Sequence, residues 1–232
     1  MYILQWKAKV QSILCKILLM IKLIIFDFDN TLVNTREATI KALKYIYKKI
    51  KPKISFKKFL EICDNFERNY NFKRKEWFYF FTKNWKKAKE LEKIYWEIVM
   101  KNTKVFEGVR ETLKKLKRKY KIVLLTLTDG KKGIKMKRIK RLKLDKYFDK
   151  IYIGMENVRE HKPKISAFKR ILKDFKVKPK EVVMVGDSYE RDILPAKKLK
   201  IFTISFRKRN NADKIIRNFK SLIKIINYVN SF

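Results

Sequence analysis

The sequence predicts an α/β fold, with a parallel, doubly wound sheet and an all-helical insertion after its first strand. Short apolar runs alternate with amphipathic stretches of helical period, which is the order of βαβ units. Residues 36–104 form a long block without glycine, in which apolar residues recur every three or four positions. Glycines follow several of the apolar runs closely, as in loops that leave strand ends. We therefore expect ligands to bind at the carboxyl edge of the sheet.

Five apolar runs are predicted to be strands, and helical patterns separate them. The strands are expected at 22–26, 121–127, 150–153, 181–185 and 200–205. Helices are expected near 109–116, 134–142, 164–174 and 189–198, and the tail at 214–229 should give a short apolar step and a last helix.

The same patterns divide the chain into three parts. Residues 20–35 and 105–232 are expected to form the α/β core, and residues 36–104 the helical insertion. Residues 1–19 are an extension, either an extra helix or an artefact of start-site choice, because Met20 opens a segment that resembles a natural protein start.

The charge balance is strongly basic. The 232 residues contain 61 Lys and Arg but 23 Asp and Glu, a formal net charge of +38. Such a surface attracts nucleic acid and other polyanions without specificity. However, the basic residues spread along the whole chain, and the heavy use of Lys, Ile and Asn fits a biased genome or adaptation to heat. Composition therefore favours this second explanation over a dedicated nucleic-acid partner.

Composition also limits the location and the kinds of site. Residues 13–26 are apolar, but Lys16 and Lys22 interrupt them, so we expect neither a membrane span nor a signal peptide. Two cysteines and one histidine exclude a disulfide framework and a structural zinc site. A reducing, cytoplasmic location fits best.

Acids, a hydroxyl and a lysine follow the predicted strands at their carboxyl ends. The first strand ends in Asp-x-Asp-x-Thr at 27–31, and the second in Thr128 and Asp129. Lys162 follows the third strand, and Gly-Asp at 186–187 with Asp192 follows the fourth. Because parallel strands end at one edge of a sheet, these side chains should converge there.

This order of motifs resembles the haloacid dehalogenase superfamily, in its phosphatase branch with a helical cap inserted after the first motif. The family's first motif matches 27–31, the second Thr128, the third Lys162 with its following proline, and the fourth 186–192. The match extends over about 20–217 and implies a Rossmann-like core. Each motif alone is weak, but four in order at the right strand ends are specific. Thr126 points to the same side of its strand as Thr128 and competes for the second role.

The resemblance implies a role for each of these residues. Asp27 would be the nucleophile that forms an aspartyl-phosphate, and Asp29 would protonate the leaving oxygen and then deprotonate the attacking water. Thr128, the backbone near Asp129, and Lys162 would bind the phosphoryl group.

The family also implies a magnesium ion at this edge. The Asp27 carboxylate, the backbone carbonyl of Asp29 and the Asp187 carboxylate would bind Mg²⁺, a hard cation that prefers oxygen ligands. Asp192 would either assist the metal through water or orient Lys162.

The sequence therefore predicts a Mg²⁺-dependent phosphatase for a small phosphorylated metabolite, such as the triose phosphate glyceraldehyde 3-phosphate, or phosphoglycolate. A phosphomutase shares all four motifs and is the main catalytic alternative. A nucleic-acid-binding protein on the same scaffold is the alternative from another class. Asp27, Asp29, Asp187 and Asp192 are all present in a chain poor in acids, which favours an enzyme. Asp29 also argues against dehalogenation, because the dehalogenases lack this second acid.

Overall fold

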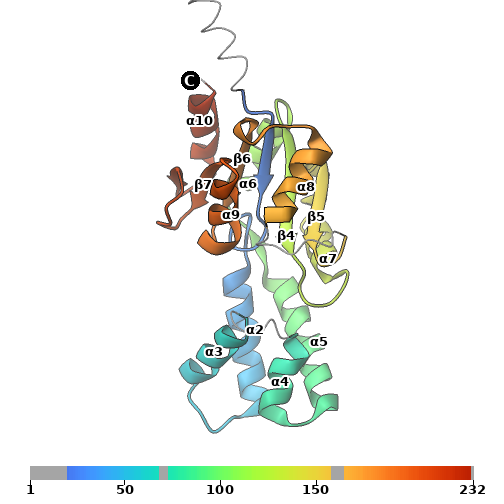
Figure 1. Ribbon diagram of the computed structural model, residues 1–232. Coiled ribbons are helices and arrows are strands. Elements are labelled where there is room, and N and C mark those ends of the chain that lie inside the picture. The colour runs from blue at the N-terminus through green and yellow to red at the C-terminus, as the bar shows by residue number, and fades with distance from the viewer. Residues whose placement is uncertain (1–19, 68–72, 158–164, 231–232) are drawn as a thin grey trace, which may run out of the picture.

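The computed structural model describes residues 20–67, 73–157 and 165–230, and its core is a six-stranded parallel sheet (Figure 1). The strand order is β5-β4-β1-β6-β7-β8. The strands are β1 (Leu23–Phe26), β4 (Lys121–Leu127), β5 (Lys150–Gly154), β6 (Val182–Gly186), β7 (Phe202–Phe206) and β8 (Lys214–Ile216). The predicted α/β class and the five predicted strands are confirmed. The predicted extension, residues 1–19, lies outside the described residues.

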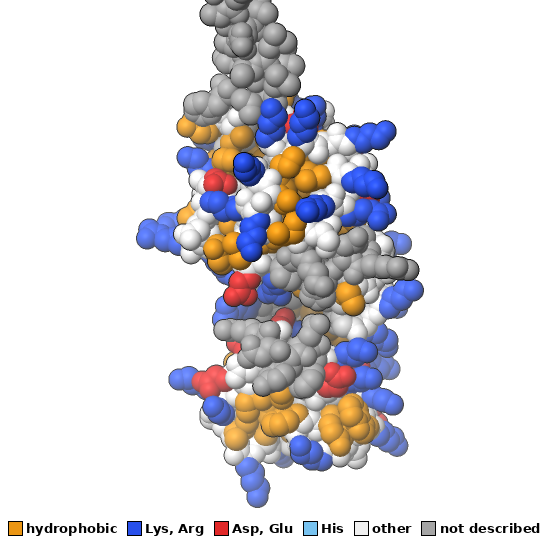
Figure 2. All heavy atoms as spheres, in the orientation of Figure 1, with side chains coloured by type: hydrophobic (Ala, Val, Ile, Leu, Met, Phe, Trp, Pro, Cys, Tyr) orange, Lys and Arg blue, Asp and Glu red, His pale blue; other side chains and the backbone are white. Residues whose placement is uncertain are grey.

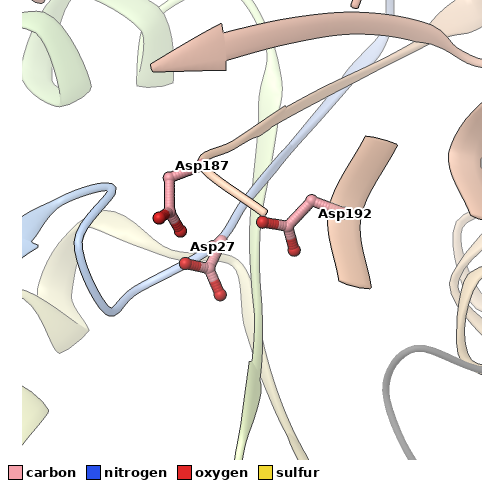
Figure 3. Close-up of side chains that lie close together, drawn as sticks. All are labelled: Asp27, Asp187 and Asp192. Atoms are coloured by element: carbon pink, nitrogen blue, oxygen red, sulfur yellow. The ribbon is translucent and has the colours of Figure 1, made fainter. Parts of the chain in front are cut away.

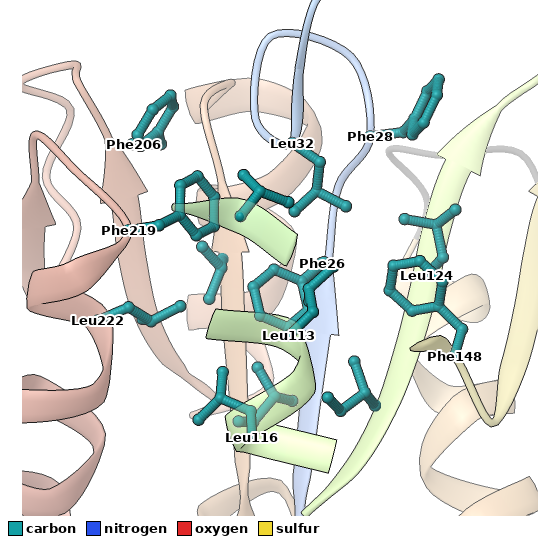
Figure 4. Close-up of a cluster of buried hydrophobic side chains, with 14 of the residues drawn as sticks. Phe26, Phe28, Leu32, Leu113, Leu116, Leu124, Phe148, Phe206, Phe219 and Leu222 are labelled. Atoms are coloured by element: carbon teal, nitrogen blue, oxygen red, sulfur yellow. The ribbon is translucent and has the colours of Figure 1, made fainter. Parts of the chain in front are cut away.

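Helices cover both faces of this sheet, as a doubly wound fold requires. They are α6 (Val109–Lys117), α7 (Ile134–Arg141), α8 (Ile165–Phe175), α9 (Leu194–Lys198) and α10 (Lys220–Val229). Along β1, Ile24 and Phe26 pack with α6 and α10, whereas Leu23 and Ile25 pack with α8 and α9. This alternation follows from the two-residue period of a strand, and both faces of β1 are fully buried. Figure 4 shows the first of these clusters, with Leu113, Phe26 and Leu222 among its members.

The sheet continues beyond β1 into the first motif. The Asp27 N–H donates a hydrogen bond of 2.9 Å to the Val185 carbonyl, which extends the pairing of β1 with β6 by one residue. Asn30 then adopts the left-handed conformation, with φ of 59°, and its N–H donates to the Val33 carbonyl. This tight turn reverses the chain directly after Asp27. The Asp27 side chain is therefore held at the carboxyl edge of the central strands.

A separate block of helices is inserted between β1 and β4. It contains α2 (Thr35–Ile50), α3 (Phe56–Asn65), α4 (Arg74–Thr82) and α5 (Trp85–Asn102). The four helices enclose their own apolar cluster, which includes Leu43, Phe59, Trp77, Phe78 and Tyr95. Figure 1 shows this helical block at the carboxyl edge of the sheet. It covers the edge at which the predicted site residues are expected.

A two-stranded antiparallel ribbon joins the helical block to the core. It pairs β2 (Val33–Asn34) with β3 (Lys104–Val105). Asn34 also caps α2, since its side chain accepts a hydrogen bond of 3.2 Å from the Glu37 N–H. The sequence does not predict this ribbon, because strands of two residues have no recognisable period.

In Figure 2, Lys and Arg side chains are scattered over both the α/β core and the helical block, between apolar patches. The basic character is therefore not confined to one element on that face. No helix in the described ranges is both long enough and apolar enough to cross a membrane.

Candidate active site

Three aspartates meet at the carboxyl edge of the sheet. Asp27 follows β1, Asp187 follows the neighbouring strand β6, and Asp192 lies in a π-helical turn at Tyr189–Ile193. One carboxylate oxygen from each lies within 4.8 Å of the others, and all three side chains are buried. Figure 3 shows the carboxylates of the three residues gathered around one point. The convergence predicted from the first and fourth motifs is therefore present in the fold.

Local contacts hold the carboxylates of Asp27 and Asp192 in place. Thr31 Oγ1 donates to Asp27 Oδ2 at 3.0 Å, and the Ser188 N–H donates to Asp192 Oδ2 at 2.9 Å. Gly186 is needed next to them, because a Cβ at that position would overlap the Asp192 carboxyl group. The Thr of the first motif and the Gly of the fourth motif thus have geometric reasons that do not depend on any ligand.

The donor set of this cluster fits a hard divalent cation. Three buried carboxylates this close repel one another, and a cation between them would offset that repulsion. The ligands are all oxygen atoms, which select Mg²⁺ or Ca²⁺ over soft metals. Lys208 Nζ lies 2.6 Å from Asp187 Oδ2 and supplies one positive charge from the rim, where its side chain is about half exposed.

Asp29 lies beside this cluster in a second set of charges. Its Oδ1 accepts hydrogen bonds from Thr35 Oγ1 at 2.5 Å and from Arg138 Nη2 at 2.8 Å, and its Oδ2 forms an ion pair with Lys135 Nζ. Lys135 and Arg138 also contact Asp129, at 2.8 and 3.0 Å. Both basic side chains are almost completely buried, with 2% and 1% exposed. The two acids and two bases therefore form a charge-balanced quartet, which is buried except at Asp29, whose side chain is 27% exposed.

The quartet determines the charge state of Asp29. Burial by itself raises the pKa of this carboxyl, but the positive charges of Arg138 and Lys135 outweigh it and lower that pKa well below its usual range. Asp29 is therefore held as a carboxylate. This form can accept a proton from water, and the same contacts oppose the protonated form that a general acid needs.

The other predicted site residues lie around the same cavity. Thr128 Oγ1 donates to Glu156 Oε1 at 2.6 Å and accepts from the Gly130 N–H at 3.3 Å. Thr126, the competing hydroxyl, lies two residues before Thr128 on β4, is buried, and also lines the cavity. The Asp129 side chain is committed to the charge quartet, so only its backbone remains for a phosphate. Lys162 lies outside the described residues.

A cavity of about 410 Å³ connects these residues with the helical block. From the core it is lined by every predicted site residue that the structure describes: Asp27, Asp29, Thr128, Asp129, Asp187 and Asp192. From the helical block it is lined by residues of α2, α3, α4 and α5, among them Thr39, Asp64, Arg74, Tyr95 and Trp96. The volume suits a small molecule.

The sequence does not mark the basic side chains of this cavity as site residues, although Arg191, beside the fourth motif, is a possible substrate contact for which a solvated role is the favoured interpretation. Lys135, Arg138, Arg191 and Lys208 all line it, together with Arg36 and Arg74. One signal was available for the first two, because residues three apart share a helix face and α7 is a predicted basic helix. In a chain with 61 basic residues, that signal does not stand out.

Comparison with known proteins agrees with this fold. The haloacid dehalogenase-like hydrolase family matches residues 24–206. Glyceraldehyde 3-phosphate phosphatase of Pyrococcus furiosus is 28% identical over 228 residues, 89% of this chain and 93% of that protein. Human N-acylneuraminate-9-phosphatase is 28% identical over 196 residues, 75% of this chain and 77% of that protein.

Solved structures share the whole architecture. A putative hydrolase of this superfamily from Bacillus subtilis, bound to magnesium, superposes with a TM-score of 0.73 over 90% of this chain and 99% of that chain, at 17% identity. At that identity the likeness concerns the fold alone. The family match, in contrast, covers most of the sequence, so the chain belongs to the haloacid dehalogenase-like hydrolases.

Proposed function

We propose that this hydrolase is a Mg²⁺-dependent phosphatase that cleaves a small phosphorylated metabolite through an aspartyl-phosphate on Asp27. The single observation that carries the proposal is the cluster of Asp27, Asp187 and Asp192, which lies at the floor of a cavity of small-molecule size. The relatives reported above are phosphatases by name, which supports the same reaction class.

The chemistry needs two displacements at phosphorus. An Asp27 oxygen attacks the phosphorus atom, and the bond from phosphorus to the ester oxygen breaks. The ester oxygen takes a proton from Asp29, which must first gain that proton from solvent or from a substrate monoanion, against the ion pairs with Lys135 and Arg138. A water molecule then attacks the aspartyl-phosphate and gives its proton to Asp29, and Asp27 is released with inorganic phosphate. The buried ion pairs of Asp29 favour its role in the second displacement, because they stabilise the carboxylate.

The remaining residues would bind the phosphoryl group and neutralise its charge. Mg²⁺ held by Asp27, Asp187 and Asp192 would offset the charge of the carboxylates and of the phosphoryl oxygens. Thr128 and the backbone at Asp129 and Gly130 are the proposed phosphoryl contacts, together with Lys162 from the third motif. For these contacts, the Thr128 hydroxyl has to rotate away from Glu156, to which it donates a hydrogen bond in this structure.

The helical block is the proposed cap of the site, and it would determine the substrate. Its helices contribute much of the cavity lining, so a metabolite in the cavity would touch both parts of the chain. A triose phosphate such as glyceraldehyde 3-phosphate, or phosphoglycolate, is the proposed substrate. The Pyrococcus furiosus relative is named for the first of these.

Replacement of the proposed nucleophile, Asp27, tests this mechanism. Asp27→Asn should lower kcat by about 10³-fold or more, because an amide cannot form the covalent intermediate. Asp145→Asn, a change of the same type in the turn at Asp145–Tyr147 away from the cavity, is the control. Release of inorganic phosphate is the readout, since a phosphomutase would instead return an isomeric phosphate. Normal turnover of Asp27→Asn would exclude the mechanism.

A further inference from the structure

Lys208 brings a positive charge to the aspartate cluster from outside the four motifs. It lies in the loop that follows β7, and β7 is the neighbour of β6 in the sheet. The loop after β7 therefore runs beside the loop after β6, which carries Asp187. Lys208 Nζ lies 2.6 Å from Asp187 Oδ2, and Lys208 also lines the cavity. The order of the strands thus explains why this lysine reaches the cluster.

The backbone around Lys208 is anchored on both sides. The Arg207 N–H donates a hydrogen bond of 2.8 Å to the Ile216 carbonyl, and Asn210 Nδ2 donates one of 3.2 Å to the Asp187 carbonyl. The Lys208 side chain, in contrast, is 55% exposed. Its ammonium group can therefore leave the carboxylate and be hydrated while the loop stays in place.

A metal ion held by the aspartate cluster would need the same carboxylate. Asp187 is one of the three members of the cluster, and Figure 3 shows its carboxylate directed toward that of Asp27. An ammonium group and a divalent cation both gain from a carboxylate, but they repel each other when only a few ångström separate them. By linkage, the ion pair weakens metal binding by the same factor by which a bound metal weakens the ion pair.

The exposure of Lys208 makes this exchange feasible. An ion pair at the surface is weak, because water competes for both partners. A divalent cation with three carboxylate ligands is attracted more strongly, so it should displace the ammonium group. Lys135, which pairs with Asp29, is the contrasting case: 2% of its side chain is exposed, so it could not exchange its partner for water.

We infer that Lys208 is an internal competitor of the metal ion: it pairs with Asp187 when no metal is bound, and a divalent cation displaces it from that carboxylate. The inference rests on the proposed metal-dependent phosphatase function and adds a regulation to its metal site. Lys208 offsets part of the repulsion among the carboxylates. It also raises the Mg²⁺ concentration that the enzyme needs above the value that the three aspartates alone would set.

Metal binding without turnover tests the competition. The affinity for Mn²⁺ is measured by electron paramagnetic resonance with the wild type, Lys208→Met and Arg209→Met. Arg209→Met is the matched control, because it removes an exposed positive charge one residue further on that does not line the cavity. Lys208→Met should bind Mn²⁺ roughly 3- to 10-fold more tightly than the wild type, since it removes a partly exposed charge beside a divalent ion. The control should stay within about 2-fold of the wild type.

Heat unfolding measures the other side of the linkage. In EDTA, Lys208→Met should have a lower Tm than the wild type, because Asp187 loses this ion pair. At saturating Mg²⁺ the difference should disappear, since the wild type no longer forms the pair and the variant binds the metal more tightly. In an Asp187→Asn background, Lys208→Met should not lower the Tm in EDTA, because the carboxylate is gone. Lys208→Gln, which keeps a polar side chain, replaces Lys208→Met in all these measurements if the latter does not fold.

The sign of the change in Mn²⁺ affinity decides the outcome. A lysine that orients Asp187 for the metal would make Lys208→Met bind Mn²⁺ more weakly, and a bystander would leave the affinity unchanged. Either result would overturn the inference. If the wild type itself binds no Mn²⁺, the metal site of the proposed function is wrong and the inference is wrong with it. If Mn²⁺ binds but no phosphate monoester is cleaved, only the proposed reaction fails, because neither readout requires turnover.

Discussion

Arg138 Nη2 lies 2.8 Å from Asp29 Oδ1, and this partly buried ion pair joins helix α7 to the loop that follows β1. The other arm of the guanidinium contacts Asp129 at 3.0 Å. One arginine thus connects the first motif with the second. Its Nη2 also donates to Thr35 Oγ1, at the first residue of the helical block.

Removing this side chain should destabilise the fold. Arg138→Met leaves two carboxylates with Lys135 as their one remaining base in the quartet. A broken pair that is fully buried costs about 3–5 kcal/mol, and the loss here should be smaller because 27% of the Asp29 side chain is exposed. Arg138→Lys keeps the positive charge but loses the planar guanidinium that contacts both carboxylates, so its free energy of unfolding should fall less. Urea unfolding measures both free energies, with the exposed Lys137→Met on the same helix as the control. A loss for Arg138→Met as small as that of the control would show that the quartet contributes nothing to stability.

This quartet also marks the limit of what the sequence predicts. The sequence predicts that Asp27, Asp187 and Asp192 converge. Each follows a strand, or the turn after it, and the carboxyl ends of parallel strands lie at one edge of the sheet. Lys135 and Arg138 contact Asp29 across more than 100 residues of sequence. That contact depends on how α7 packs against the first motif, which no local period encodes. For the same reason β8, with three residues, was expected only as a short apolar step.

The aspartate cluster predicts a dependence on Mg²⁺. Excess EDTA should abolish phosphatase activity, and Mg²⁺ should restore it, because three buried carboxylates repel a phosphate dianion without a cation between them. Asp187→Ala should raise the Mg²⁺ concentration needed for half-maximal activity, since it removes one ligand of the proposed site. Binding of Mn²⁺, followed by electron paramagnetic resonance, gives a second readout that does not require turnover. Full activity in excess chelator would contradict the assignment.

Asp174 predicts how stability depends on pH. Hydrogen bonds from Lys150 and Tyr152, at 2.7 and 2.6 Å, lower the pKa of this carboxyl from 3.8 to about 2. A carboxyl whose pKa is lower in the folded state than in the unfolded state stabilises the protein at every pH above its unfolded-state pKa. This stabilisation disappears as the pH falls from the unfolded-state pKa through the folded-state pKa. Asp174→Asn should therefore unfold at lower urea than the wild type at pH 7, and the difference should shrink between pH 3.8 and about 2. Tyr152→Phe, which removes one of the donors, should show a smaller difference in the same pH window.

The basic helical block predicts a dependence on ionic strength. Between residues 36 and 104 the basic side chains outnumber the acidic ones, and Lys86, Lys89 and Lys93 of α5 are exposed. A cationic cover over a site for phosphate dianions should raise the rate of encounter. It should affect the chemical step little, because exposed charges are screened within about 10 Å at 0.1 M salt. We therefore expect kcat/KM to fall as salt rises, whereas kcat stays nearly constant.

A triple variant tests whether the exposed lysines cause this effect. Replacing Lys86, Lys89 and Lys93 by Gln should flatten the dependence of kcat/KM on ionic strength and leave kcat unchanged at high salt. The same variant should bind single-stranded DNA more weakly at low salt, because binding of polyanions scales with the number of cations that contact the phosphates. If kcat/KM of the wild type is insensitive to salt, the basic surface does not steer the substrate. The charge of +38 is then better explained by composition, since the lysines spread along the whole chain.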